Sequence, residues 1–154
     1  MFNQLLPRRL DNTYRGRRLA LWLFALVVSM RILQSLLVIF NGYSTAMNAD
    51  GIPLDTYPAA AAQTVVGLFA LSGLYRLILS LLCVLVLARY RAAIPFMFVV
   101  LLLNYLAAQL ILRFVPLHRV GAPPASVVNL TLFAITAAGL VLSLRKRGDE
   151  ELRG

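Results

Sequence analysis

Three polar residues, Arg31, Arg76 and Asn104, lie near the middle of long apolar segments, where polar side chains are rare. At about 1.5 Å of rise per residue, a helix that begins at Leu19 carries Arg31 roughly 18 Å from its start, too deep to reach an aqueous interface easily. A charged side chain at the centre of a bilayer costs about 2.5–3.5 kcal/mol on insertion scales. Both arginines are therefore predicted to face a bundle interior, water or a bound anion.

Helical spacing groups further polar side chains with these three residues. Gln34 follows Arg31 at i+3 and shares its helix face. A guanidinium group presents five donors in a planar fork that matches a carboxylate or a phosphate, so the chemistry predicted here is anion binding. The candidate ligand-binding residues are Arg31, Arg76, Asn104, Gln34, Gln109 and Tyr75.

The apolar segments contain no acidic residue. All six lie in connections or termini, and they are Asp11, Asp50, Asp55, Asp149, Glu150 and Glu151. Asp50 and Asp55 are interpreted as residues of a solvated turn. Three interpretations of the central arginines follow. In the first, the arginines line a cavity for an anion or polar headgroup. In the second, they donate hydrogen bonds to Asn104 and to backbone carbonyls and so fix helix packing. In the third, they meet carboxylates of a partner subunit.

The elements that must position these residues are transmembrane helices. The 154 residues are 60% hydrophobic and only 14% charged, whereas a soluble domain carries about 25% charged residues. Crossing a bilayer takes roughly 20 apolar helical residues. The sequence predicts an all-α, integral membrane four-transmembrane-helix bundle with spans at about 19–40, 64–88, 92–115 and 125–144.

The connections between the spans differ in length. Residues 43–63 are predicted to form the longest loop, and Pro58 indicates that a helix begins before the second span. The link at residues 89–91 is so short that spans two and three are predicted to be antiparallel neighbours. The domain organisation is a cytoplasmic basic arm at 1–18, a single membrane domain at 19–147 and a charged cytoplasmic tail at 148–154.

Basic residues predict the orientation. Five Lys or Arg lie in residues 1–18, two in 89–91 and four in 145–154, whereas the connections on the opposite side hold Arg119 alone. Short cytoplasmic loops carry an excess of basic residues, so both termini are predicted to be cytoplasmic. A retained first span, disulfide-free loops and this compact arginine-rich layout favour a bacterial inner membrane.

The net charge of +9 is interpreted as a signal for topology and for anionic lipid headgroups at the cytoplasmic face, not for nucleic acid. The single cysteine, Cys83, excludes an intrachain disulfide, and the sole histidine, His118, has no second ligand nearby, so neither a metal nor another cofactor is expected. No catalytic motif and no carboxylate within a span is present, which makes an enzyme the less favoured reading.

The favoured function is that of a non-enzymatic subunit, assembly factor or modulator, which works by packing against a membrane protein partner or a second copy of itself. The alternative is a binder or carrier of a lipid or small anionic solute that uses the central arginines Arg31 and Arg76. A second alternative is an enzyme that acts on a lipid-soluble substrate. These functions differ in whether a cavity exposes the two guanidinium groups.

Overall fold

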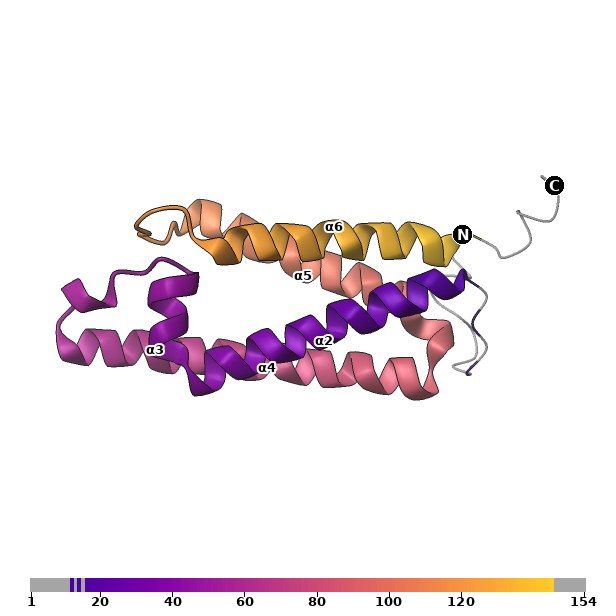
Figure 1. The fold of residues 1–154 in the computed structure, drawn as a ribbon, viewed down its shortest axis with the longest axis horizontal. Coiled ribbons are helices and arrows are strands. Elements are labelled where there is room, and N and C mark those ends of the chain that lie inside the picture. Colours follow the sequence, from indigo (N-terminus) through magenta and orange to yellow (C-terminus); the bar gives the residue numbers. More distant parts are fainter. Residues whose placement is uncertain (1–11, 13, 15, 146–154) are drawn as a thin grey trace.

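The computed structural model describes residues 12, 14 and 16–145, and over these residues it is helical without a strand. Most of the predicted basic arm and the whole of the predicted tail therefore lie outside the described residues. Four long helices dominate the fold (Figure 1), namely α2 (Arg18–Phe40), α4 (Ala59–Arg89), α5 (Ile94–Phe114) and α6 (Pro124–Leu144). Each is long and apolar enough to cross a membrane, which confirms the predicted number of such helices.

Sequence signals explain where these helices begin. Prolines stand immediately before or within the first turn of three of them, where the missing N–H costs no intrahelical hydrogen bond: Pro58 precedes α4, Pro95 lies in the first turn of α5 and Pro124 begins α6. Helix α4 starts five residues before the predicted span, as the Pro58 signal indicated. Large apolar side chains such as Trp22, Leu68, Ile111 and Leu130 remain exposed, as expected of helices whose solvent is lipid.

Helix α2 has the central position in the bundle. It packs along both α4 and α6, and α5 packs mainly on α6 (Figure 1). Helices α4 and α5 run in opposite directions, as predicted from the short link, but they share few contacts. The prediction that they are close neighbours is therefore correct only in part, because α2 and not α5 provides the main packing surface for α4.

A hydrophobic core closes the bundle at the end where α2 begins and α6 ends. Its centre is an edge-to-face contact between Phe24 of α2 and Phe98 of α5, with ring centroids 5.0 Å apart. Gly139 of α6 lies against Phe98, where a Cβ atom would come within 2.5 Å of the ring. The backbone N–H of Arg17 donates to the carbonyl of Leu142 at the same end. These contacts join α2, α5 and α6 there, and Cys83 and Val86 of α4 belong to the same core.

The opposite end is covered by residues 42–57, which we call the cap. The sequence predicted a loop for most of this segment, but it contains three short helical elements: α3 (Gly42–Ser44), the π-helical η1 (Thr45–Ala49) and the 3-10 helix η2 (Leu54–Thr56). A second hydrophobic cluster fastens the cap to α4 through Ala46, Ile52, Leu54 and Ala62.

Gly51 joins the cap to the connection between α5 and α6. Its φ of +71° lies in the left-handed region, which favours glycine. Its carbonyl accepts a hydrogen bond from the backbone N–H of Val120 at 2.8 Å. The cap therefore contacts both halves of the molecule, α4 on one side and the α5–α6 connection on the other.

Candidate functional site

A cavity of about 570 Å³ lies in the half of the molecule next to the cap. Pockets that hold drug-sized ligands have volumes of about 300–1,000 Å³. The lining residues come from all four long helices, the cap and the α5–α6 connection, and those that carry polar side chains are Arg31, Gln34, Thr45, Asp50, Arg76, Asn104, Tyr105, Gln109, Arg119, Ser126 and Asn129.

At its end nearest the middle of the long helices, the cavity brings together the three residues singled out by their depth in the sequence. Arg31 from α2, Arg76 from α4 and Asn104 from α5 all line it. The like charges of Arg31 and Arg76 are close enough to repel each other. Among the residues that the structure describes, no carboxylate forms an ion pair with either guanidinium group, and the buried Nε of Arg31 has no hydrogen-bond partner. A buried donor without an acceptor is costly, so this end of the cavity favours an incoming acceptor.

Two buried serines fix the backbone on which the arginines stand. Ser35 donates to the carbonyl of Arg31 at 2.7 Å, and Ser80 donates to the carbonyl of Arg76 at 2.8 Å. Both serines are almost fully buried. Gly73 lets the two helices approach closely, because a Cβ atom there would come within 3.0 Å of Ile39. The local sequence thus positions the arginines through helix packing, while their side chains stay free of these bonds.

The walls of the cavity carry amides. Gln34, Gln109 and Asn129 line it from α2, α5 and α6. Their side chains, like that of Asn104, form no hydrogen bond with another described residue. Tyr105 is held in the wall by stacking on Phe133, with ring centroids 4.7 Å apart. Uncommitted amides can donate to or accept from a ligand, so the wall can bind polar groups beside the charged one.

Two charged residues at the cap end were not among the predicted site residues. Arg119 donates from Nη1 to Ser126 Oγ at 3.4 Å, and its buried Nε has no partner among the described residues. Burial raises the pKa of the Asp50 carboxyl above its ordinary value, an effect opposed by the positive charges of Arg119 and Arg76. Asp50, interpreted as a residue of a solvated turn, does lie in a turn, but it is only partly exposed and lines the cavity. The sequence did contain a signal for Arg119, because it is the one basic residue in the connections predicted to lie opposite the termini.

Tyr75 does not line the cavity, unlike the other five predicted site residues. Its side chain is 69% exposed on the surface of α4. Successive residues of an α-helix are rotated by about 100°, so the residue before Arg76 points to a different side. His118 also lies outside the lining, Cys83 is buried in the core, and no group of three possible metal ligands occurs in the part of the chain that the structure describes.

Comparison with protein-family models, curated proteins and solved structures gave no match. The chemistry of the cavity is therefore argued from its own residues. Its lining holds three guanidinium groups, from Arg31, Arg76 and Arg119, and one carboxylate, from Asp50. Arginine stays protonated in proteins and donates in a geometry that fits oxyanions. The arrangement is suited to binding a carboxylate or a phosphate.

Proposed function

We propose that the protein spans a membrane with its four long helices and binds an anionic molecule in the cavity. The observation that carries this proposal is that Arg31 and Arg76 both line a cavity while neither is paired with a described carboxylate. A charge at this depth is stable only beside a counter-charge, strong acceptors or water. A bound oxyanion supplies both the counter-charge and the acceptors.

A purely structural role for the arginines has less support. It required hydrogen bonds from the guanidinium groups to Asn104 and to backbone carbonyls, and no such bond joins Arg31 or Arg76 to the described residues. The core around Phe24 and Phe98 already stabilises helix packing without the two arginines. We therefore place anion binding ahead of the subunit or assembly role that the sequence favoured.

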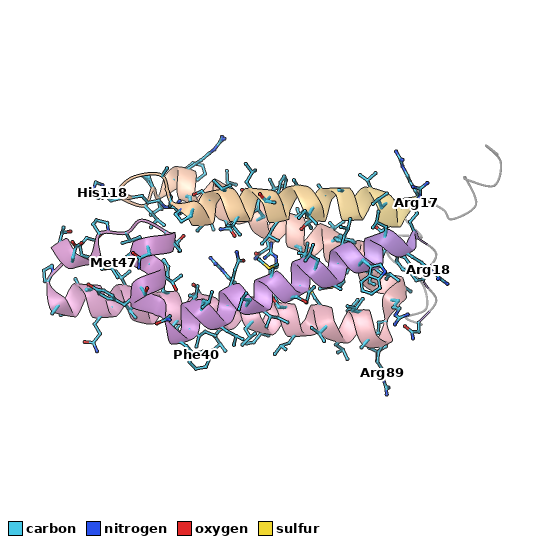
Figure 2. All side chains as sticks on the ribbon, in the orientation of Figure 1. Arg17, Arg18, Phe40, Met47, Arg89 and His118 are labelled. Atoms are coloured by element: carbon cyan, nitrogen blue, oxygen red, sulfur yellow. The ribbon has the colours of Figure 1, made fainter. Side chains whose placement is uncertain are left out.

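The distribution of basic residues supports an orientation with both termini in the cytoplasm. Arg17, Arg18 and Arg89 lie at one end of the molecule, and Met47 and His118 lie at the other (Figure 2). Under the positive-inside rule, the arginine-rich end is cytoplasmic and the cap faces the outside. In a bacterial inner membrane, the location that we propose, the cavity then lies between the midplane and the periplasmic surface.

Thermal unfolding of the purified chain in a neutral detergent tests the binding proposal. The probe is dioleoyl phosphatidic acid, with dioleoyl phosphatidylcholine as its net-neutral counterpart. A ligand at 100 times its Kd stabilises the folded state by about 2.7 kcal/mol, so we expect a rise in Tm of several degrees with phosphatidic acid only. The rise is expected to be lost in Arg31→Gln and Arg76→Gln.

Arg89→Gln is the matched control, because it removes the same charge from the same helix as Arg76 but lies at the helix end outside the cavity. It should keep the rise in Tm. Equal responses of the wild type to phosphatidic acid, oleate, inorganic phosphate and phosphatidylcholine would contradict anion binding. Recovery of a partner protein whose carboxylate crosslinks to Arg31 would instead favour the subunit role.

A further inference from the structure

The cavity has an incomplete wall between α4 and α5. Helix α4 contributes only Arg76 to the lining, whereas α2, α5 and α6 each contribute several residues. The two helices also share few contacts, although a short link joins them. In Figure 1, α2 and α4 lie apart from α5 and α6 toward the cap end. The side of the cavity between α4 and α5 is therefore the side that helix packing does not close.

Three polar lining residues of α4 and α5 are exposed although they lie within long apolar helices. They are Arg76, Asn104 and Gln109. Elsewhere on the surfaces of the same two helices, apolar residues such as Leu71, Ile78 and Leu106 are exposed as well. At this depth in a bilayer, the opening faces acyl chains and not water. Polar groups there require a polar occupant, whereas the surroundings of the opening require an apolar one.

The lining itself has the same two-part character. Its cationic groups come from Arg31, Arg76 and Arg119, and leucine side chains such as Leu112 and Leu130 form part of the remaining wall. A volume of about 570 Å³ lies in the range of sites for drug-sized ligands, more than a single inorganic anion needs. A molecule with an oxyanion at one end and a hydrocarbon chain at the other matches both parts.

We propose that the ligand is an amphiphile with an oxyanion headgroup, which enters sideways from the bilayer between α4 and α5. This inference rests on the proposed anion-binding function. The ligand's headgroup is bound by Arg31 and Arg76, with Asn104 and Gln109 beside them. Its chain leaves through the opening and remains among the surrounding acyl chains. A second copy of this protein is a poorer occupant, because its long apolar helices contain no acidic residue.

Binding measured in phosphatidylcholine nanodiscs separates the headgroup from the chain. The probes are lysophosphatidic acid, glycerol 3-phosphate, which carries the same phosphate without a chain, and lysophosphatidylcholine, which carries the chain without net charge. We expect lysophosphatidic acid to bind at least about tenfold more tightly than either of the other two, and about tenfold more weakly in Arg76→Gln. Arg89→Gln should bind it as the wild type does.

The failures of the two proposals are distinguishable. Equal binding of glycerol 3-phosphate and lysophosphatidic acid would overturn the amphiphile while leaving anion binding intact. Absence of binding by either phosphate compound would overturn anion binding as well. Equal binding of lysophosphatidylcholine and lysophosphatidic acid would show that the chain alone is recognised, which contradicts both.

The sideways route has its own test. Ala108 lines the cavity one helical turn after Asn104, whereas Ala107 is exposed and does not line it. Ala108→Trp is expected to weaken lysophosphatidic acid binding at least about tenfold, and Ala107→Trp is the matched control. A lysophosphatidic acid with a diazirine early in its chain should label peptides of α4 and α5. Labelling confined to the cap and α6 would overturn the route, and so would unchanged binding by a folded Ala108→Trp protein.

Discussion

Asp50 is the one carboxylate among the residues that line the cavity, and its charge opposes the binding of any anion. Burial raises its pKa, while the positive charges of Arg119 and Arg76 lower it by less, so the pKa stays above its ordinary value. The folded state therefore holds this proton more firmly than the unfolded state does. By linkage, the stabilising contribution is complete below the ordinary pKa and is lost as the pH rises through the raised one.

Asp50→Asn is expected to raise the Tm at neutral pH, because it removes a charge that folding disfavours. The gain should disappear at about pH 3, below the ordinary pKa, where the carboxyl is protonated in both states. Thermal unfolding at the two pH values measures this difference. Asp55→Asn is the control, since it removes an exposed carboxylate of the cap that does not line the cavity. A Tm gain of equal size at both pH values would contradict the account.

For single residues, depth in an apolar segment was the informative signal in the sequence. It predicted that Arg31 and Arg76 face a bundle interior, water or a bound anion, and both line one cavity together with Asn104. Proximity in sequence was less informative, since Tyr75 points to the surface although it precedes Arg76. The place of Asp50 could not be predicted, because it depends on how the cap packs on α4 and not on any neighbour in the sequence.

The helices were predictable as elements because long apolar runs and prolines mark them, while the packing between them depends on single contacts. Gly139 of α6 is one such contact, since Phe98 of α5 occupies the space that a Cβ atom would need. The helical elements of the cap, unlike the long helices, were not predicted from the sequence. These short elements are held by Ala46, Ile52 and Leu54 against α4, a tertiary effect that the loop prediction for residues 43–63 could not include.

Gly139→Ala is expected to destabilise the protein by about 1–3 kcal/mol, the usual cost of overpacking, because the added methyl group would lie 2.5 Å from the Phe98 ring. The measurement is thermal or denaturant unfolding in detergent. Gly67→Ala is the matched control, as its Cβ atom would meet nothing within 4 Å. Equal stability of the two variants would show that the contact with Phe98 does not restrict this position.

Gly51→Ala is expected to loosen the cap. The φ of +71° costs an L-residue about 1–2 kcal/mol, and the Cβ atom would also come within 2.9 Å of the Val120 carbonyl. Hydrogen exchange at the Val120 amide, which donates to Gly51, should speed up. Gly121→Ala separates the cost of the backbone angle from the cost of the clash, because Gly121 has a φ of +75° but open space around it. An effect no larger at Gly51 than at Gly121 would show that the backbone angle alone matters.

The whole molecule has a closed end and an open end. The core around Phe24 and Phe98 joins all four helices at the first, and the cavity and the cap occupy the second. The sequence could predict that both termini of the bundle lie at one end, because four spans with short links require it. It could not predict that α2 separates α4 from α6, since helix order in space depends on side-chain fit and not on the length of the links.

Cysteine labelling tests the orientation of this layout. In a Cys83→Ala background, Asn48→Cys places a thiol on the exposed surface of the cap, and Arg145→Cys places one at the end of α6. With a membrane-impermeant maleimide and intact spheroplasts, we expect complete labelling at position 48 and protection at position 145 until the membrane is opened. Labelling of both positions before lysis, or the reverse pattern, would contradict a cytoplasmic C-terminus.

The spatial order of the helices also bears on how the chain is made. Helix α5 finds its main packing surface on α6, which is synthesised after it. The 30 residues between Phe114 and Leu144 take about 1.5–6 s to translate at 5–20 residues per second. In the membrane arrangement that we propose, α5 resides in the bilayer without its partner during that interval, with Asn104 and Gln109 facing lipid or the translocation machinery. A nascent chain arrested before Pro124 would therefore hold an assembled α2–α4 pair beside a helix that is inserted but not yet packed.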